Sequence, residues 1–339
     1  MSTADFADFS DNAVMFASVV YILAFLAHLT EWVLVRSLPV PVTVPVTADR
    51  RVAVGAGHPA PPAAGSTTGS TTGSTTGEDF SDRELRVEKW GRIGVALTVL
   101  GCLLHASGLV ARGLGSDPVR VPWGNMYEFT LAGTLGVSFM YLVLMRRYHL
   151  RWMGVLVTAF LVVVLMLDVL VLYQDAGPLV PALHSYWLAV HVLAAIIASG
   201  AFSVGALTLV LFLVKDRAER RGTLSPRGYL ARLPEAVSLE RVAYRLHAFG
   251  FPIWTFAALV AGPIWAEYAW GSYWNWDPKE VWAFITWVIY AAYLHARATA
   301  GWRGKAASVI ALVAFASLLF NFVGINYFFG GGSLHSYAG

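Results

Sequence analysis

Eight apolar runs, each close to the length of a membrane-spanning helix, restrict the folds that this sequence can adopt. A helix needs roughly 20 predominantly apolar residues to cross the hydrocarbon core of a bilayer. Backbone polar groups must be satisfied inside that core, so such runs predict helices. We therefore predict an all-α polytopic membrane protein with helices at about 13–35, 91–111, 124–145, 153–173, 185–214, 247–265, 279–296 and 306–327.

The composition supports this class and argues against a soluble enzyme. Of the 339 residues, 57% are hydrophobic and 13% are charged, whereas soluble domains carry about 25% charged residues. The net charge of +3 reflects cytoplasmic lysines and arginines and does not indicate nucleic-acid binding. Cys102 is the only cysteine, which excludes an intrachain disulfide and a cysteine-rich metal site.

Basic clusters predict how these helices are oriented. Lysine and arginine collect at 146–151, 215–221 and 297–305, which are alternate loops. Positively charged loops stay in the cytoplasm. We therefore expect a plasma-membrane protein with both termini extracytoplasmic, together with the loops at 112–123, 174–184 and 266–278.

The chain divides into three predicted parts. Residues 1–36 hold the first transmembrane helix, and residues 91–339 form a seven-helix core. Residues 37–90 contain Val-Pro and Gly-Ser-Thr-Thr repeats, which have little apolar surface to bury and predict a disordered cytoplasmic linker. The mixed charge of residues 216–246 predicts a short cytoplasmic or interfacial helix.

The most distinctive stretch, residues 265–280, lies between the sixth and seventh predicted helices. Asp277, Pro278 and Glu280 form a helix start, with an N-cap, a proline at the first position and an acid three residues after the cap. A mostly non-helical aromatic platform is thus expected to lead into a membrane helix. An ordinary interfacial aromatic belt is the alternative. The aromatic residues are Trp265, Tyr268, Trp270, Tyr273, Trp274 and Trp276.

Two histidines flank this stretch and share its predicted side of the membrane. His184 and His335 both occur in the sequence Leu-His-Ser-Tyr. Imidazole is the usual neutral axial ligand of heme iron, so one hypothesis is a heme held by this pair against the tryptophans. The alternative is that each histidine is hydrogen-bonded within the fold.

His295 indicates a second, inner position. It lies 17 residues after Pro278, which is roughly 25 Å deeper at 1.5 Å per residue, so it cannot share a metal with the outer pair. His28 lies at a similar inner depth on the first helix. Pairing of His28 with His295, pairing of His295 with another protein, and a structural role for His28 all remain open.

Three further residues have two interpretations each. Arg112 and Arg120 are either solvated loop residues or partners of heme propionates, because guanidinium matches carboxylate geometry. His191, two helical turns after His184, either bonds into the outer site or packs structurally.

Residues 270–282 resemble the tryptophan-rich WWD signature of heme-handling membrane proteins. The wider set of motifs resembles the CcsA/ResC family of System II cytochrome c maturation, which actinobacterial genomes often label CcsB. The resemblance covers most of the chain from about residue 91. Its other motifs are residues 125–129, 183–187 and 293–297 and the terminal His335.

The resemblance implies that heme b moves outward and is joined to the thiols of an apocytochrome Cys-x-x-Cys-His motif. It assigns His184 and His335 as outer axial ligands and His295 to the inner heme site. The heme-presenting residues would be Trp270, Trp274, Trp276 and Asp277. The family works with a ResB/Ccs-type membrane partner, so the chain would be one subunit of a holocytochrome c synthase, or heme lyase, complex.

Two other function classes stay open. The chain would otherwise be a heme exporter or chaperone that delivers heme to a separate lyase, or a non-heme transporter or scaffold with an aromatic belt. Thioether formation depends mainly on positioning, so we expect no catalytic side chain, and Cys102 is a poor candidate for attaching heme.

Overall fold

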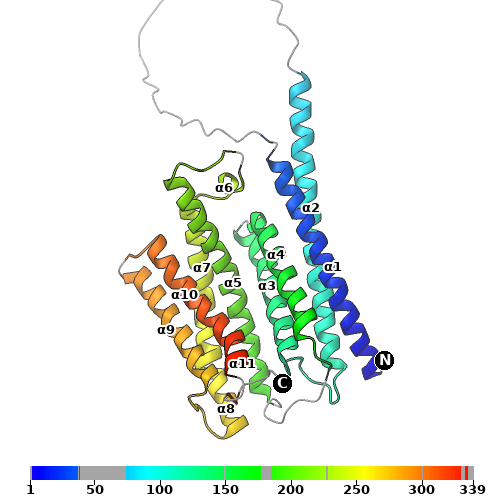
Figure 1. The fold of residues 1–339 in the computed structure, drawn as a ribbon, viewed down its shortest axis with the longest axis vertical. Helices are drawn as coiled ribbons and strands as arrows, with labels where there is room; N and C mark the ends of the chain where they lie inside the picture. Colours follow the sequence, from blue (N-terminus) through cyan, green and yellow to red (C-terminus); the bar gives the residue numbers. More distant parts are fainter. Residues whose placement is uncertain are drawn as a thin grey trace, which may run out of the picture.

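The computed structural model describes residues 2–36, 38, 74–148, 150–176, 185–226, 228–299, 301–329 and 333–334, with side chains in the second helix from residue 81. Over these residues the chain is helical and contains no strand, as predicted. Figure 1 shows long helices packed side by side in one bundle. The elements are α1 (Thr3–Val35), α2 (Ser74–Leu114), α3 (Met126–Tyr148), η1 (Leu150–Met153), α4 (Gly154–Leu167), η2 (Asp168–Leu172), α5 (Tyr186–Arg220), α6 (Tyr229–Arg232), α7 (Ala236–Phe256), η4 (Ala257–Ala261), α8 (Gly262–Trp270), α9 (Pro278–Thr299), α10 (Lys305–Leu319), η5 (Phe320–Gly324) and α11 (Ile325–Phe328).

The helices confirm a polytopic membrane protein. Among the described residues, seven helical stretches are long and apolar enough to cross a membrane. Helix α9, with 22 residues, is the eighth candidate and runs beside α10 (Figure 1). Its aromatic residues, His295 and Arg297 make it more polar than its neighbours.

Successive long helices alternate in direction, so the bundle has two distinct ends (Figure 1). Helix α1 begins, and α11 ends, at the end that also holds α8 and the start of α9. We call this the outer end, following the predicted orientation. The other, inner end holds α6 and the connection between α3 and η1.

Two buried clusters hold the bundle together. The first surrounds Tyr21 and Tyr141 between α1, α3 and α4. The second surrounds Phe202 and Tyr290 between α5, α7, α9 and α10. Helix α5 contributes to both clusters and therefore joins the two halves. Large apolar side chains such as Leu170, which is 77% exposed, point away from these clusters, as expected for a lipid-facing surface.

Two predicted boundaries are wrong. Residues 74–90, assigned to the disordered linker, belong to α2. That extension is polar and charged, with pairs such as Glu88–Arg92 at 2.5 Å, which support a helix one turn apart but escape a search for apolar runs. The rest of the predicted linker, apart from residue 38, lies outside the described residues. The sixth membrane helix begins at Ala236 rather than at about 247, and the short helix expected in 216–246 is present as the four-residue α6 before it.

Three of the membrane helices contain a π-turn in their outer half. These turns are η2 after α4, η4 between α7 and α8, and η5 between α10 and α11. A π-turn inserts an additional residue into a helix and is frequent at functional sites. Periodicity did not predict these turns, because one extra residue leaves an apolar run looking continuous.

Close helix contacts bury His28 at the crossing of α1 with α2 and α4. A Cβ added at Gly154 would lie 2.6 Å from His28 Cε1, a distance that forces the ring or the helix to move. We expect Gly154→Ala to lower the free energy of unfolding by about 1–3 kcal/mol, measured by thermal unfolding in detergent. Gly133→Ala is the control, because its Cβ meets nothing within 4 Å. Equal unfolding midpoints for the two variants would contradict this packing.

Candidate functional site

The connection between α8 and α9 at the outer end is a hydrogen-bonded turn. Gly271 ends α8 in the left-handed conformation, with φ of 71°, which glycine adopts without a Cβ clash. Lys279 N donates to Asp277 Oδ1 (2.9 Å) and Asp277 N donates to Glu280 Oε2 (3.2 Å). The predicted helix start is therefore confirmed, with Pro278 as the first residue of α9.

The predicted non-helical platform is partly wrong. Residues 265–270 continue the helix, because nothing interrupts the backbone hydrogen bonding before Gly271. Only residues 271–277 leave the helix, and we call them the tryptophan turn. Within it, Trp276 has a φ of 55°, a conformation that costs a non-glycine residue about 1–3 kcal/mol and clusters at functional sites.

The four tryptophans separate into two pairs. Trp265 is buried and lies edge-on to Trp270, with ring centroids 4.8 Å apart. Trp274 and Trp276 are edge-on at 5.9 Å, and Trp276 is 73% exposed. The indole nitrogen of Trp274 is buried and has no hydrogen-bond partner in the described part of the chain. The turn thus combines an exposed aromatic surface with an unmet hydrogen-bond donor.

Asp277 ties the C-terminal segment to the tryptophan turn. Its buried carboxylate accepts hydrogen bonds from Ser333 Oγ (2.8 Å) and from Leu334 N (2.6 Å). His335 follows Leu334 directly in the sequence but lies outside the described residues. The structure therefore fixes Leu334, the residue before this predicted ligand, against the tryptophan turn.

Ser185, which follows the other predicted ligand, His184, is the N-cap of helix α5. Ser185 Oγ accepts from Trp187 N at 3.2 Å and caps the helix. The first turns of α5 pack on α8 through a small cluster that includes Trp265. His184 precedes Ser185 and, like His335, lies outside the described residues. Iron ligation by the two histidines stays a prediction.

His191 packs structurally beneath this region. Its ring stacks on Trp265 at 5.9 Å, and its Nδ1 lies 2.8 Å from Ala257 O in the π-turn η4. A carbonyl oxygen only accepts, so Nδ1 carries the proton. Trp123 joins the same cluster and was missed by sequence reasoning. Its position just before a predicted outer helix end was the only available signal.

Arg112 and Arg120 are buried rather than solvated, so the solvated interpretation is wrong. Arg120 makes a bidentate pair with Glu128, at 2.6 and 2.8 Å. Arg112 bonds Glu128 and Asp11, each at 3.4 Å, and also the carbonyl of Gln174. Glu128 near the start of α3 is the buried anion that both cations share. This charged network leaves neither guanidinium unpaired, and the structure does not favour the propionate interpretation.

The periphery of this network is held by a tyrosine. Tyr173 Oη donates to Asp11 Oδ2 at 2.7 Å. Desolvation, and then the hydrogen bond to Asp11, raise the pKa of the Tyr173 phenol to about 12. The phenol therefore keeps its proton at neutral pH and remains a donor to Asp11.

The two inner histidines lie on different sides of the bundle. His295 is exposed on α9. His28 is fully buried on α1, with Glu31 at 3.4 Å and Thr98 at 3.5 Å. Helices α1 and α9 lie at opposite sides of the bundle (Figure 1). Within this chain the two imidazoles are therefore not paired, and His28 has the surroundings of a structural histidine.

Comparisons with known proteins place these features in a family. Residues 123–331 match the family described as cytochrome C assembly protein. The cytochrome c biogenesis protein CcsA of Guillardia theta is 34% identical over 261 residues, with 72% of this chain and 85% of the relative covered. CcsA of Synechococcus sp. strain JA-3-3Ab is 34% identical over 303 residues, covering 73% and 84%. CcsA of Porphyra purpurea is 33% identical over 292 residues, covering 74% and 89%. The matched segment includes the tryptophan turn.

Proposed function

Because the chain belongs to the cytochrome c assembly protein family and acts in cytochrome c maturation, we propose that it holds heme b at its outer end for attachment to apocytochrome c. His184 and His335 would be the axial ligands. The observation that carries this proposal is the binding of residues 333–334 by Asp277. It brings the chain next to His335 against the tryptophan turn.

The residues of the outer end suit a flat, largely apolar ligand. Trp270, Trp274 and Trp276 offer aromatic faces, and the buried indole N–H of Trp274 lacks an acceptor among the described residues. Neutral imidazoles can serve as axial ligands of heme iron without adding charge to the site. In the described part of the chain, no group of three or more potential ligand side chains gathers to hold a bare metal ion. A macrocycle that supplies its own four equatorial nitrogens needs no such group.

When bound, heme b would supply two vinyl groups, and each thiol S–H of the apocytochrome motif would add across one vinyl C=C bond with no net redox change. This chain would orient and shield rather than donate or remove protons. Its one thiol, on Cys102, is buried in α2, twelve residues before the outer end of that helix. Positioning of the vinyl groups beside the incoming thiols is the main acceleration expected, and exposed Trp276 leaves the turn open to an approaching apocytochrome.

The inner position favours a partner protein. An imidazole exposed on a membrane helix, as His295 is on α9, is unfavourable against lipid and indicates a buried polar contact in the assembled state. We propose that a ResB/Ccs-type membrane protein covers this face and supplies the second inner imidazole. Heme would then pass from the inner site to the outer one.

The proposal is tested by visible spectroscopy of the chain purified alone and with its partner. We expect a low-spin bis-histidine heme spectrum and heme attachment to a co-expressed Cys-x-x-Cys-His reporter. His335→Gly and His184→Gly should each reduce attachment and recover it with added imidazole, whereas His295→Gly should reduce heme content before that step. His58→Gly, far outside the matched motifs, is the control.

Two results would contradict the proposal. Absence of any heme spectrum would favour a non-heme transporter or scaffold. Heme binding without attachment, even with the partner present, would favour an exporter or chaperone that delivers heme to a separate lyase.

A further inference from the structure

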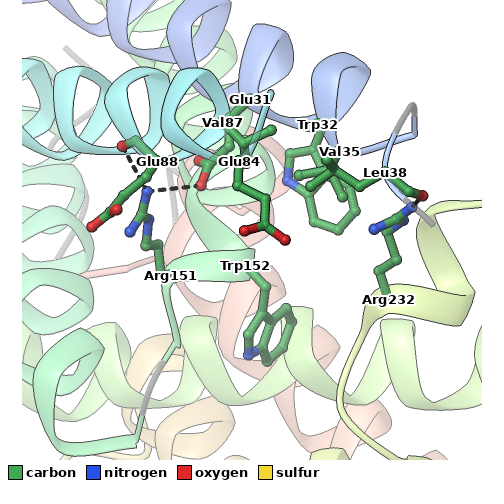
Figure 2. A pocket seen from close by; sticks show the side chains of 10 residues that line it. All are labelled: Glu31, Trp32, Val35, Leu38, Glu84, Val87, Glu88, Arg151, Trp152 and Arg232. Carbon is green, nitrogen blue, oxygen red and sulfur yellow. Dashed lines mark hydrogen bonds and ion pairs between the residues drawn. The ribbon is translucent and has the colours of Figure 1, made fainter. Parts of the chain in front are cut away.

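A cavity of about 450 Å³ opens at the inner end of the bundle. Figure 2 shows it between α1, α2, η1 and α6, with two tryptophan side chains facing it. Ligand sites usually have volumes of about 300–1,000 Å³, so the cavity is large enough for a small ligand or a lipid headgroup. Its lining residues are Glu31, Trp32, Val35, Leu38, Glu84, Val87, Glu88, Arg151, Trp152 and Arg232.

Most charges around the cavity already have partners. Arg151 pairs with Glu31 at 3.1 Å, and Glu88 pairs with Arg92 at 2.5 Å. Two charged groups remain without an ion pair in the described chain, one of each sign, namely Glu84 and Arg232. The cavity therefore presents one cation and one anion to whatever occupies it, on walls that are otherwise largely apolar.

Arg232, which lines the cavity, has an unused hydrogen-bond donor in the described part of the chain. Its Nη2 donates to Leu38 O at 2.7 Å, but its buried Nε has no hydrogen-bond partner. Beside it, Tyr229 packs against Trp32 at a tilt of 55°, with ring centroids 3.9 Å apart, and the buried Tyr229 hydroxyl also lacks a partner among the described residues. Buried donors without acceptors are destabilising, so an acceptor-rich group such as a phosphate would be stabilising beside Arg232.

We propose that this cavity seats the headgroup of a phospholipid that carries a phosphate and a primary ammonium, as in phosphatidylethanolamine. The phosphate would accept from Arg232, and the ammonium would donate to Glu84. The cavity lies where α1 and α2 leave the predicted inner face of the membrane, and tryptophans favour that interfacial depth. The acyl chains would then run outward into the bilayer.

The charge count favours this ligand over a dianionic one. Three carboxylates and two guanidiniums line the cavity, and Arg92 beside it pairs with one of those carboxylates. A purely anionic group, such as the heme propionates or an anionic headgroup, would therefore leave Glu84 without a counter-charge. A primary ammonium also has three N–H donors for carboxylate oxygens, which a trimethylated ammonium lacks. The occupant is therefore expected to be a zwitterion with a primary amine.

The test is lipid selection by the full-length protein in nanodiscs that contain equal amounts of phosphatidylethanolamine, phosphatidylcholine and phosphatidylglycerol. Native mass spectrometry of the released protein should show preferential retention of phosphatidylethanolamine. Arg232→Gln should lower that retention about tenfold, since a hydrogen bond to a charged group contributes about 1.5–3 kcal/mol. Glu84→Gln should lower it less, because its exposed carboxylate is screened by water.

Controls are available on the same exposed helix. Arg86→Gln and Asp82→Asn remove matched charges outside the cavity and should leave retention unchanged. Equal retention of the three lipids, preference for phosphatidylglycerol or phosphatidylcholine, or heme bound at Arg232 would each overturn the proposal. If Arg232→Gln fails to fold, Glu84→Gln still tests the proposal, because it changes an exposed helical residue and is expected to fold. The readout does not depend on heme attachment.

Discussion

Replacing Asp277 with alanine is expected to abolish cytochrome c assembly while leaving the chain in the membrane. The Asp277 carboxylate accepts from Lys279 N, Ser333 Oγ and Leu334 N. Hydrogen bonds to a charged group contribute about 1.5–3 kcal/mol each, and the alanine variant loses all three. The segment before His335 would detach, and α9 would lose its cap. Attachment of heme to a co-expressed apocytochrome reporter, per unit of membrane-inserted protein, is the measurement.

The response to imidazole separates this effect from loss of a ligand. Exogenous imidazole replaces a missing side chain but not a missing anchor, so Asp277→Ala should remain inactive under conditions that restore His335→Gly. Ser333→Ala, which removes one of the three hydrogen bonds, should retain intermediate activity. Full activity of Asp277→Ala would show that the tethering of residues 333–334 is irrelevant to the outer site.

Glu128→Ala is expected to give the largest loss of stability at the outer end. Glu128 is fully buried and pairs with both Arg112 and Arg120. Removing one partner of a buried ion pair costs about 3–5 kcal/mol, because an uncompensated charge remains. We expect a much lower unfolding midpoint in detergent and poor accumulation in the membrane.

Smaller changes to the same network define the control. Asp11 is 39% exposed and bonds the edge of Arg112 and the Tyr173 hydroxyl, and an asparagine can still accept from both, so Asp11→Asn should cost little in the same assay. Glu128→Gln, which keeps the shape but not the charge, should fall between these two variants. An Asp11→Asn midpoint as low as that of Glu128→Ala would show that the shared carboxylate is not the centre of the network.

Apolar length was sufficient to predict the membrane helices but not where they end. The outer ends of α3 and α9 agree with the sequence interpretation because a cap or a turn marks them. The polar start of α2 and the continuous α7–η4–α8 stretch disagree, because charged residues extend a helix as readily as apolar ones once it has begun. Apolar content shows where a helix meets lipid, whereas hydrogen bonding decides how far it continues.

The candidate site was predictable where its contacts are local. The cap at Asp277 involves residues only two and three positions away, so the sequence pattern predicted it. The contact between Asp277 and Leu334 spans 57 residues and uses a backbone N–H, which leaves no mark on residue type. The burial of Arg112 and Arg120 was not predicted because it depends on their shared partner, Glu128. In the sequence, Glu128 looks like an ordinary acidic residue in the first turn of a helix, and only the packed structure brings it to both arginines.

The π-turns change how a helix is rotated about its own axis between the inner end and the outer end of the bundle. One additional residue rotates everything beyond it by about 100° around the helix axis. The helical segments α8 and α11, which follow η4 and η5, therefore present other sides to their neighbours than they would if the helices continued regularly. The inner parts of these helices can therefore pack in one register while the segments beyond the turns present other side chains at the outer end. A single continuous helix can thus have one set of packing contacts inside the bundle and another at the outer end.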